Sequence, residues 1–287
     1  PILRSGCAPG PAARALVTRA LPVALLAILL NAVEWVPTVA AGPQTARAQL
    51  PEEYPETRLD FPVEETLTLA FPHFFGDRIG SEYWGRDRAF HGERTVTVGG
   101  VALALALFGA GFHPDRRLRA VAAGLGVVSL LLAYGSQAGV YTALKALVPP
   151  MGLTRGACRF LFGVSWALSL LAAMGVEGLA RRMESDLRAV RRAAAGMALA
   201  ALASALLVVK LRLVGVGDWS ATATLLAVAR SAFMLAALAG ALFVLVSRQA
   251  SGAAAAAGLS ALIVLDLLSI HARCFRPGPA RPEGTMP

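Results

Sequence analysis

Residues 221–246 read ATATLLAVARSAFMLAALAGALFVLV, a run of 26 residues with a single charge, Arg230. An α-helix rises 1.5 Å per residue and the hydrocarbon core of a bilayer is about 30 Å thick, so roughly 20 apolar residues are enough to cross it. Lipid offers the backbone no water for hydrogen bonds, so such a segment crosses the bilayer as a helix. The run therefore predicts a transmembrane helix and decides the fold class.

Six further apolar runs, of 17 to 22 residues each, have the same character. The chain of 287 residues is 56% hydrophobic and 16% charged, with a mean hydropathy of +0.60, whereas soluble domains carry about 25% charged residues. The sequence therefore predicts an all-α, polytopic transmembrane helical bundle with about seven spans and one long outer loop. The other six runs cover residues 20–41, 95–112, 120–140, 160–180, 193–209 and 253–270.

The first run has a second interpretation, as a secretory signal peptide. Arg14 and Arg19 precede or open it, and Ala46-Arg47-Ala48 resembles a signal-peptidase site. We favour an internal membrane helix, because the chain starts with Pro rather than Met and six more runs follow. Since both ends of the chain also have loop-like sequences, we expect a fragment of a longer membrane protein.

Arginines in the short connections predict the orientation of the helices. They are concentrated before the first run, after the second and after the fourth, and cytoplasmic loops carry an excess of Lys and Arg. These three segments should therefore face the cytoplasm. The predicted organisation is a cytoplasmic lead-in with the first helix (1–41), an outer aromatic-rich loop (42–94), a six-helix transmembrane region (95–270) and an outer tail leading to a missing domain (271–287).

The long outer loop contains LTLAFPHFFGDRIGSEYWG, residues 67–85, which is rich in aromatic side chains. Aromatic rings favour the headgroup zone of a membrane. Two structures fit this segment: an interfacial helix or re-entrant turn, and a small ordered loop packed on the ends of the helices.

Several functional classes are excluded by composition and motifs. The formal charge is +9, but no basic groove with interleaved aromatics is present, so no nucleic-acid partner is expected. Cys7, Cys158 and Cys274 are far apart and form no C-x-x-C or His/Cys cluster, which predicts no zinc site; we expect unpaired thiols, with a Cys158–Cys274 disulfide left open. No P-loop, G-x-S-x-G or H-E-x-x-H motif occurs. We expect no cofactor, and nothing supports a divalent metal.

Charges inside the apolar runs are the most informative polar residues, because they are costly in lipid. Glu34, Arg230 and Asp266 lie roughly 10, 13 and 6 Å from the outer ends of their runs, whereas Glu177 lies near the cytoplasmic end. An Arg230–Asp266 contact between sequential helices is feasible at these depths. The three outer residues predict either a polar cavity that binds substrate, or a structural ion pair with Glu34 hydrogen-bonded in the bundle.

Two further pairs are candidate binding residues. Arg155 and Arg159 are four residues apart at the outer start of the fourth run, and arginine is suited to clamping phosphate. They predict either a lipid-phosphate site or ordinary contact with headgroups. His73 and Asp77, one helical turn apart, are a candidate site pair, with packing or solvent contact as the alternative.

Five short motifs follow one another along most of the chain: 32–37 (AVEWVP), 71–76 (FPHFFG) with 83–85 (YWG), 98–100 (VGG), Val148-Pro149 followed by Arg155 and Arg159-Phe160, and Asp266-Leu267-Leu268. Their order resembles the bacterial YfhO-like membrane proteins, which are related to C-type membrane glycosyltransferases. The likeness spans most of the chain, but each motif is short. Ala157 stands where the family's pattern has proline, and Glu34 where it has glutamine.

The resemblance implies transfer of a sugar from a polyprenyl-phosphate donor to an extracytoplasmic acceptor at the bacterial cytoplasmic membrane. Membrane lipids and the polyprenyl-phosphate-linked sugar would be the partners, with Arg155 and Arg159 as the phosphate clamp. The family's acidic catalytic residue would lie before residue 1. Two other functions stay open: a transporter or flippase for a lipid-linked or amphipathic solute, with Glu34, Arg230 and Asp266 lining its pathway, and a non-catalytic membrane scaffold.

Overall fold

The computed structural model describes residues 32–41, 59–76, 83–85, 94–147, 156–213 and 219–272, together with single residues and short pieces between residues 18 and 44. The chain divides into two compact units, residues 1–55 with 145–154, and residues 56–144 with 155–287. In the first unit the described part of the first apolar run is helical and ends in α2 (Ala32–Ala41). Everything that follows concerns the second unit.

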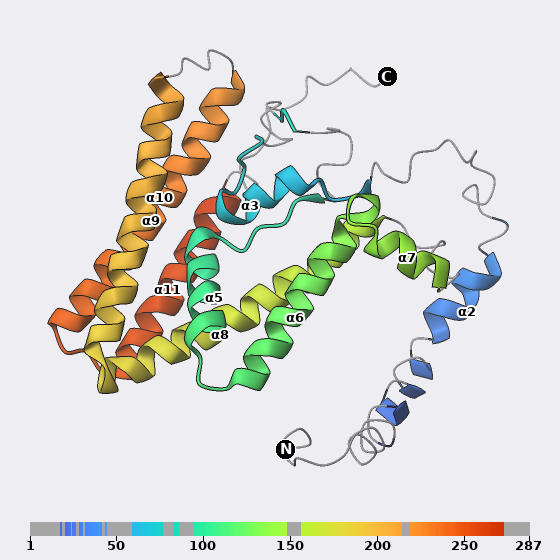
Figure 1. The fold of residues 1–287 in the computed structure, drawn as a ribbon, viewed down its shortest axis with the longest axis horizontal. Coiled ribbons are helices and arrows are strands. Elements are labelled where there is room, and N and C mark those ends of the chain that lie inside the picture. Colours follow the sequence, from blue (N-terminus) through green and yellow to red (C-terminus); the bar gives the residue numbers. More distant parts are fainter. Residues whose placement is uncertain are drawn as a thin grey trace, which may run out of the picture. The chain divides into compact units, whose positions relative to one another are not determined.

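Over its described residues, the second unit has helices as its regular elements and no strands, as predicted (Figure 1). Four helical segments are long and apolar enough to cross a membrane. The first runs from Ala157 into α8 (Leu161–Ser185), and the others lie within α9 (Leu187–Leu213), α10 (Trp219–Ser247) and α11 (Gly252–His271). The predicted total of about seven spans is not confirmed, because the second and third runs form shorter or more polar helices and the first run is described only in part. The remaining elements are η3 (Val63–Thr66), α3 (Leu67–Ala70), α5 (Gly100–Phe112), α6 (Arg116–Ala133), η5 (Gly135–Gln137), α7 (Val140–Leu147) and η7 (Ala157–Phe160).

Helix α5 begins five residues later than the apolar run 95–112 predicts. Gly99 has φ +82°, a left-handed conformation that stops a helix from extending further back. Residues 95–99 instead have no regular secondary structure, and Val96 and Val98 are buried. The 13 residues of α5 are about 20 Å long, which is too short to cross a 30 Å hydrocarbon core alone.

Helix α6 covers residues 116–133 rather than the predicted 120–140. Its N-cap is Asp115, whose carboxylate accepts hydrogen bonds from the backbone N–H groups of Arg117 (2.9 Å) and Leu118 (3.1 Å). Its other end is set by Gly135 (φ +60°), against which the carboxylate of Asp60 packs so closely that a side chain at residue 135 would overlap it. Ser136 donates from its backbone N–H and its hydroxyl to the same carboxylate.

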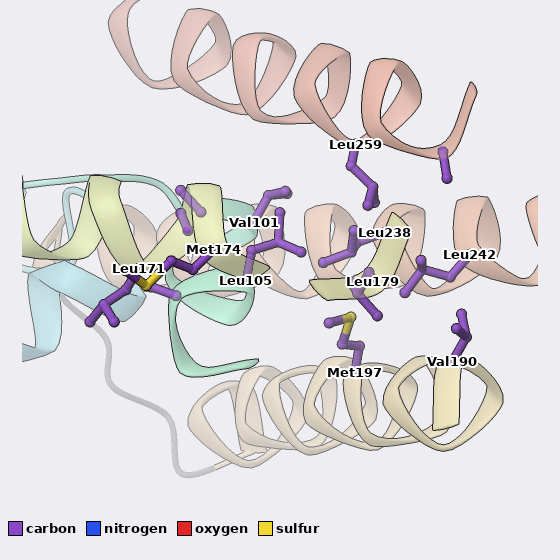
Figure 2. Packing of buried hydrophobic residues seen from close by; sticks show 14 of the residues in the cluster. Val101, Leu105, Leu171, Met174, Leu179, Val190, Met197, Leu238, Leu242 and Leu259 are labelled. Carbon is purple, nitrogen blue, oxygen red and sulfur yellow. The ribbon is translucent and has the colours of Figure 1, made fainter. Parts of the chain in front are cut away.

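Helix α8 is the centre of the second unit and packs against α5, α6, α9 and α11. Figure 2 shows leucine, valine and methionine side chains of α5, α8, α9, α10 and α11 packed together, among them Leu105, Leu171, Met174 and Leu179. Glycine permits the closest approach. A Cβ atom at Gly109 of α5 would overlap the carbonyl oxygen of Leu171, and one at Gly175 of α8 would overlap the carbonyl oxygen of Leu105.

Within the aromatic segment 67–85, the described residues form α3 and a turn over residues 71–76, and η3 precedes them. Backbone carbonyl groups tie the segment to α10: Ser231 and Thr224 donate to Ala70 (3.0 Å) and Phe74 (2.9 Å). The described residues therefore form an ordered loop packed on the long helices. That this loop lies at a membrane interface or faces the outer side stays a prediction.

Arginines from two of the three segments predicted to be cytoplasmic, those after the second and fourth runs, lie at one end of the second unit. That this end faces the cytoplasm stays a prediction. Arg119 of α6 donates to the carbonyl groups of Gly111 and His113, and Arg182 of α8 donates to the carbonyl of Phe112. The end of α5 thus meets the start of α6 and the end of α8. We call this the arginine end, and the end at which α5 begins and α11 finishes the loop end.

Candidate functional site

The Arg230–Asp266 contact predicted from the sequence is present between α10 and α11. The guanidinium Nη2 forms an ion pair with the carboxylate Oδ1 and donates to the backbone carbonyl of Asp266 at 2.8 Å. Nε and Nη2 also donate to the hydroxyl of Ser269, at 2.9 and 2.7 Å. The side chain of Asp266 is 1% exposed and that of Arg230 is 19% exposed, so the pair is largely out of reach of solvent.

The second oxygen of Asp266 has a structural task that the sequence did not reveal. Oδ2 accepts a hydrogen bond from the backbone N–H of Val101 at 2.9 Å, in the first turn of α5. A carboxylate at a helix N-terminus satisfies an unpaired donor and interacts favourably with the helix dipole. Both oxygens of Asp266 are therefore occupied. This geometry favours the structural ion pair over a base or ligand that meets substrate.

The structure does not place the other predicted site residues together around the Arg230–Asp266 pair. His73 does lie nearby, since its Nε2 is 3.3 Å from the carbonyl oxygen of Ile270 at the end of α11. Arg159 is exposed on η7. Asp77 and Arg155 lie outside the described residues, and the side chain of Glu34 is also outside them. The predicted phosphate clamp and the predicted outer cavity thus stay predictions.

A buried polar cluster holds the loop end together, and sequence reasoning missed it. Glu65 and Arg94 are 2% and 1% exposed, and the Arg94 Nη2 is 3.8 Å from the Glu65 Oε1. The hydroxyl of Tyr83 donates to the same oxygen at 2.5 Å. Beside them is a cavity of about 20 Å³, also lined by Thr68 and His73, which is enough room for roughly one water molecule. Glu65, Tyr83 and Arg94 belong to different segments of the loop, so no local sequence motif indicates the cluster.

Burial raises the pKa of Glu65 above its ordinary value of 4.5, and the hydrogen bond from Tyr83 and the charge of Arg94 offset part of that rise. A carboxyl group whose pKa is raised in the fold binds its proton more tightly there than in the unfolded chain. Its contribution to stability is complete below pH 4.5 and is lost as the pH rises through the folded-state pKa.

We therefore expect Glu65→Gln to remove this pH dependence. The wild type should lose melting temperature relative to the Gln variant as the pH rises from 4.5 through the raised pKa, because only the wild type must hold a buried carboxylate there. Thermal unfolding in detergent, followed at a series of pH values, measures the difference.

Tyr83→Phe is the matched variant for this experiment. It removes the hydrogen bond that lowers the Glu65 pKa, so its pH-dependent window should extend to higher pH. A wild-type-minus-Gln difference that stays constant across the whole pH series would show that Glu65 does not titrate in the fold.

A lateral groove of about 640 Å³ lies between α5, α8 and α11. On α8 its lining runs from Ser165 to Arg181, a stretch of seventeen residues and about 24 Å along the helix axis, which is most of the hydrocarbon thickness. Its floor is largely alanine, valine, leucine and isoleucine. Its polar members are Thr97, Ser165, Ser169, Glu177, Arg181 and Ser260.

Hydroxyl groups lie along the groove, and an ion pair lies at its arginine end. The hydroxyls of Ser165, Ser169 and Ser260 have no hydrogen-bond partner among the described residues, so they are available to a ligand. Glu177 Oε1 accepts from Arg181 Nη2 at 2.5 Å, and its Oε2 lies 3.3 Å from His113 Nε2. The four-residue spacing of Ser165 and Ser169 was a signal for this polar stripe in the sequence.

A second groove of about 860 Å³ lies between α9 and α10, lined mainly by alanine, leucine and phenylalanine with Arg191 at the arginine end. Over the described residues no group of three His, Cys, Asp or Glu side chains is placed to hold a metal ion. Cys158 is buried and forms no disulfide among the described residues, while Cys7 and Cys274 lie outside them.

Neither the family models, nor the curated proteins, nor the solved structures compared with this chain match it. The class of protein therefore rests on the fold: an all-helical membrane protein with at least four helices able to span a bilayer and a polar-lined groove along the central one.

Proposed function

We propose that this chain binds a lipid-linked or amphipathic solute in the groove along α8 and moves its polar head between the two sides of a membrane. The observation that carries the proposal is the length of the groove combined with its chemistry. Hydroxyl groups and an ion pair line the groove over about 24 Å. Polar side chains are costly in lipid, and where they line a pathway they replace the water that a polar head gives up.

A solute with an apolar tail requires a groove that is open to the lipid along one side. The apolar tail can stay among the lipid chains while the head passes along Ser165, Ser169 and Ser260 to Glu177 and Arg181. The Arg230–Asp266 pair then serves to hold α5, α10 and α11 in place beside the groove rather than to line it, since neither residue is part of the lining.

The second candidate is the sugar transfer that the family resemblance implies, at the bacterial cytoplasmic membrane. It is favoured by the loop over residues 59–76, which packs on α10 and α11 and can cover a reaction at the loop end. In this function the groove holds the polyprenyl tail of the donor. Such a cover would exclude water from the reacting sugar.

Filling the groove should reduce activity under either function. Ala173 is exposed on the groove wall, so Ala173→Trp places a large ring in the path. We expect translocation of a fluorescent polyprenyl-phosphate-linked sugar across phosphatidylcholine vesicles, read by its accessibility to an external quencher, to fall about tenfold or more. Sugar transfer to an acceptor outside the same vesicles tests the second function.

Ala203→Trp is the matched control, because Ala203 is exposed on α9 and lines neither groove. It should leave translocation unchanged. Equal rates in Ala173→Trp and Ala203→Trp would exclude the groove as the path. If the wild type transfers sugar without translocating the lipid, and Ala173→Trp abolishes that transfer, the chain has the second function.

A further inference from the structure

Arg181 lies where the groove opens at the arginine end, and its side chain is 66% exposed. Its only described partner is the carboxylate of Glu177, four residues earlier on α8, which is itself 48% exposed. An exposed pair of this kind contributes little to stability. Arg181 can therefore exchange that carboxylate for another anion with little loss of stability.

Glu177 keeps a second partner if Arg181 turns away. His113 is 7% exposed, and its Nδ1 accepts a hydrogen bond from the backbone N–H of Asp115 at 3.2 Å. A neutral imidazole with an accepting Nδ1 carries its proton on Nε2. That Nε2 faces Glu177 Oε2 at 3.3 Å and donates to it. The carboxylate is thus held without Arg181.

The charged side chains at this end of the groove carry a net positive charge. Arg182 donates to the carbonyl of Phe112 at 3.0 Å, and its guanidinium carbon lies 5.4 and 5.7 Å from the ring centres of Phe108 and Phe112. Arg119 donates to the carbonyl of His113 at 3.2 Å, and Asp115 caps α6 beside it. With Glu177 and Asp115 against Arg119, Arg181 and Arg182, the sum of these side chains is two negative and three positive charges. One singly negative phosphate would balance it.

We propose that Arg181 binds the phosphate group of the lipid whose tail occupies the groove, exchanging Glu177 for a phosphate oxygen while His113 retains Glu177. This inference rests on the proposed groove function and deepens it, because it assigns the ligand class as a phosphate-bearing lipid and the bound position of the phosphate as the arginine end. Arginine suits this role because its planar fork can donate two hydrogen bonds to one phosphate.

The experiment measures binding of two fluorescent lipids of equal chain length, a polyprenyl phosphate and the corresponding polyprenol, to the full chain in nanodiscs. The wild type should prefer the phosphate about tenfold, the strength of one charge-assisted hydrogen bond. Arg181→Gln should abolish this preference and leave polyprenol binding intact, whereas Arg181→Lys should keep part of it. Arg188→Gln, on the exposed start of α9 and outside the groove lining, should keep all of it.

Glu177→Gln gives the sharpest readout. If Glu177 competes with phosphate for Arg181, removing its charge should tighten polyprenyl phosphate binding about threefold or more. A purely structural pair would show unchanged or weaker binding. Millimolar inorganic phosphate should not displace the lipid, since it lacks the tail that the groove holds; displacement would mean a free-anion site and overturn the proposal.

The failures of the two proposals are distinguishable. If Ala173→Trp lowers the binding of both lipids but Arg181→Gln keeps the phosphate preference, Arg181 is not the phosphate ligand and the groove function stands. If Ala173→Trp changes the binding of neither lipid, the groove is not the binding site and both proposals fall.

Discussion

Asp266→Leu should destabilise the protein by about 3–5 kcal/mol, the cost of leaving one member of a buried ion pair alone. The substitution removes the only described anion beside Arg230, whose Nη1 is already buried without a hydrogen-bond partner among the described residues. It also removes the acceptor for the N–H of Val101, at the start of α5. The measurement is the free energy of unfolding in mixed detergent micelles.

Three further variants identify the cause of the loss. Asp266→Asn keeps an acceptor for Val101 but no charge, so it should fall between the wild type and Asp266→Leu. Arg230→Met alone leaves a buried carboxylate, which the N–H of Val101 still binds. The double variant Arg230→Met with Asp266→Leu should recover much of the loss, since replacing both partners by apolar groups is often close to neutral. Additive losses in the double variant would contradict the ion-pair account.

Gly109→Ala should destabilise the contact between α5 and α8 by about 1–3 kcal/mol or more. The added Cβ atom would overlap the carbonyl oxygen of Leu171, which is backbone and cannot rotate aside, so the two helices must separate. Gly175→Ala should have a similar effect, because its Cβ atom would overlap the carbonyl oxygen of Leu105. Separation also loosens the leucine and methionine packing around α8 (Figure 2).

The same helix provides the control for this prediction. A Cβ atom at Gly111 of α5 meets nothing within 4 Å. Gly111→Ala should therefore stabilise the protein slightly, by about 0.5–1 kcal/mol, through helix propensity alone. Opposite signs for Gly109→Ala and Gly111→Ala, measured by unfolding in the same micelles, are the expected result. Equal changes at the two positions would mean that the close approach of α5 and α8 does not limit stability.

Part of the site followed from sequence because depth in a membrane can be counted. Arg230 and Asp266 both lie in the outer halves of their apolar runs, roughly 13 and 6 Å from the outer ends, and an isolated charge in lipid is so costly that a partner was expected. The contact is present. The substrate-binding role predicted for the same residues has less support, because both oxygens of Asp266 bind groups of the protein itself, the N–H of Val101 and the guanidinium of Arg230.

Other features depended on contacts between distant segments. The start of α5 at Gly100 depends on Asp266, 166 residues later in the chain. Glu65, Tyr83 and Arg94 looked like ordinary loop residues, and only their burial together shows that they form a polar cluster. The groove along α8 depends on how far α5 and α11 rotate about their axes, which hydropathy does not encode.

The sequence alone determined the class of the molecule: apolar runs of span length make helices, because an unpaired backbone in lipid is too costly for any other structure. That property is a sum over neighbouring residues and needs no knowledge of the rest of the chain. Only the tertiary structure decided where α5 begins, which charges meet and which polar side chains share the α8 groove. Those outcomes depend on distances between residues far apart in the sequence, which are fixed when whole helices pack against one another.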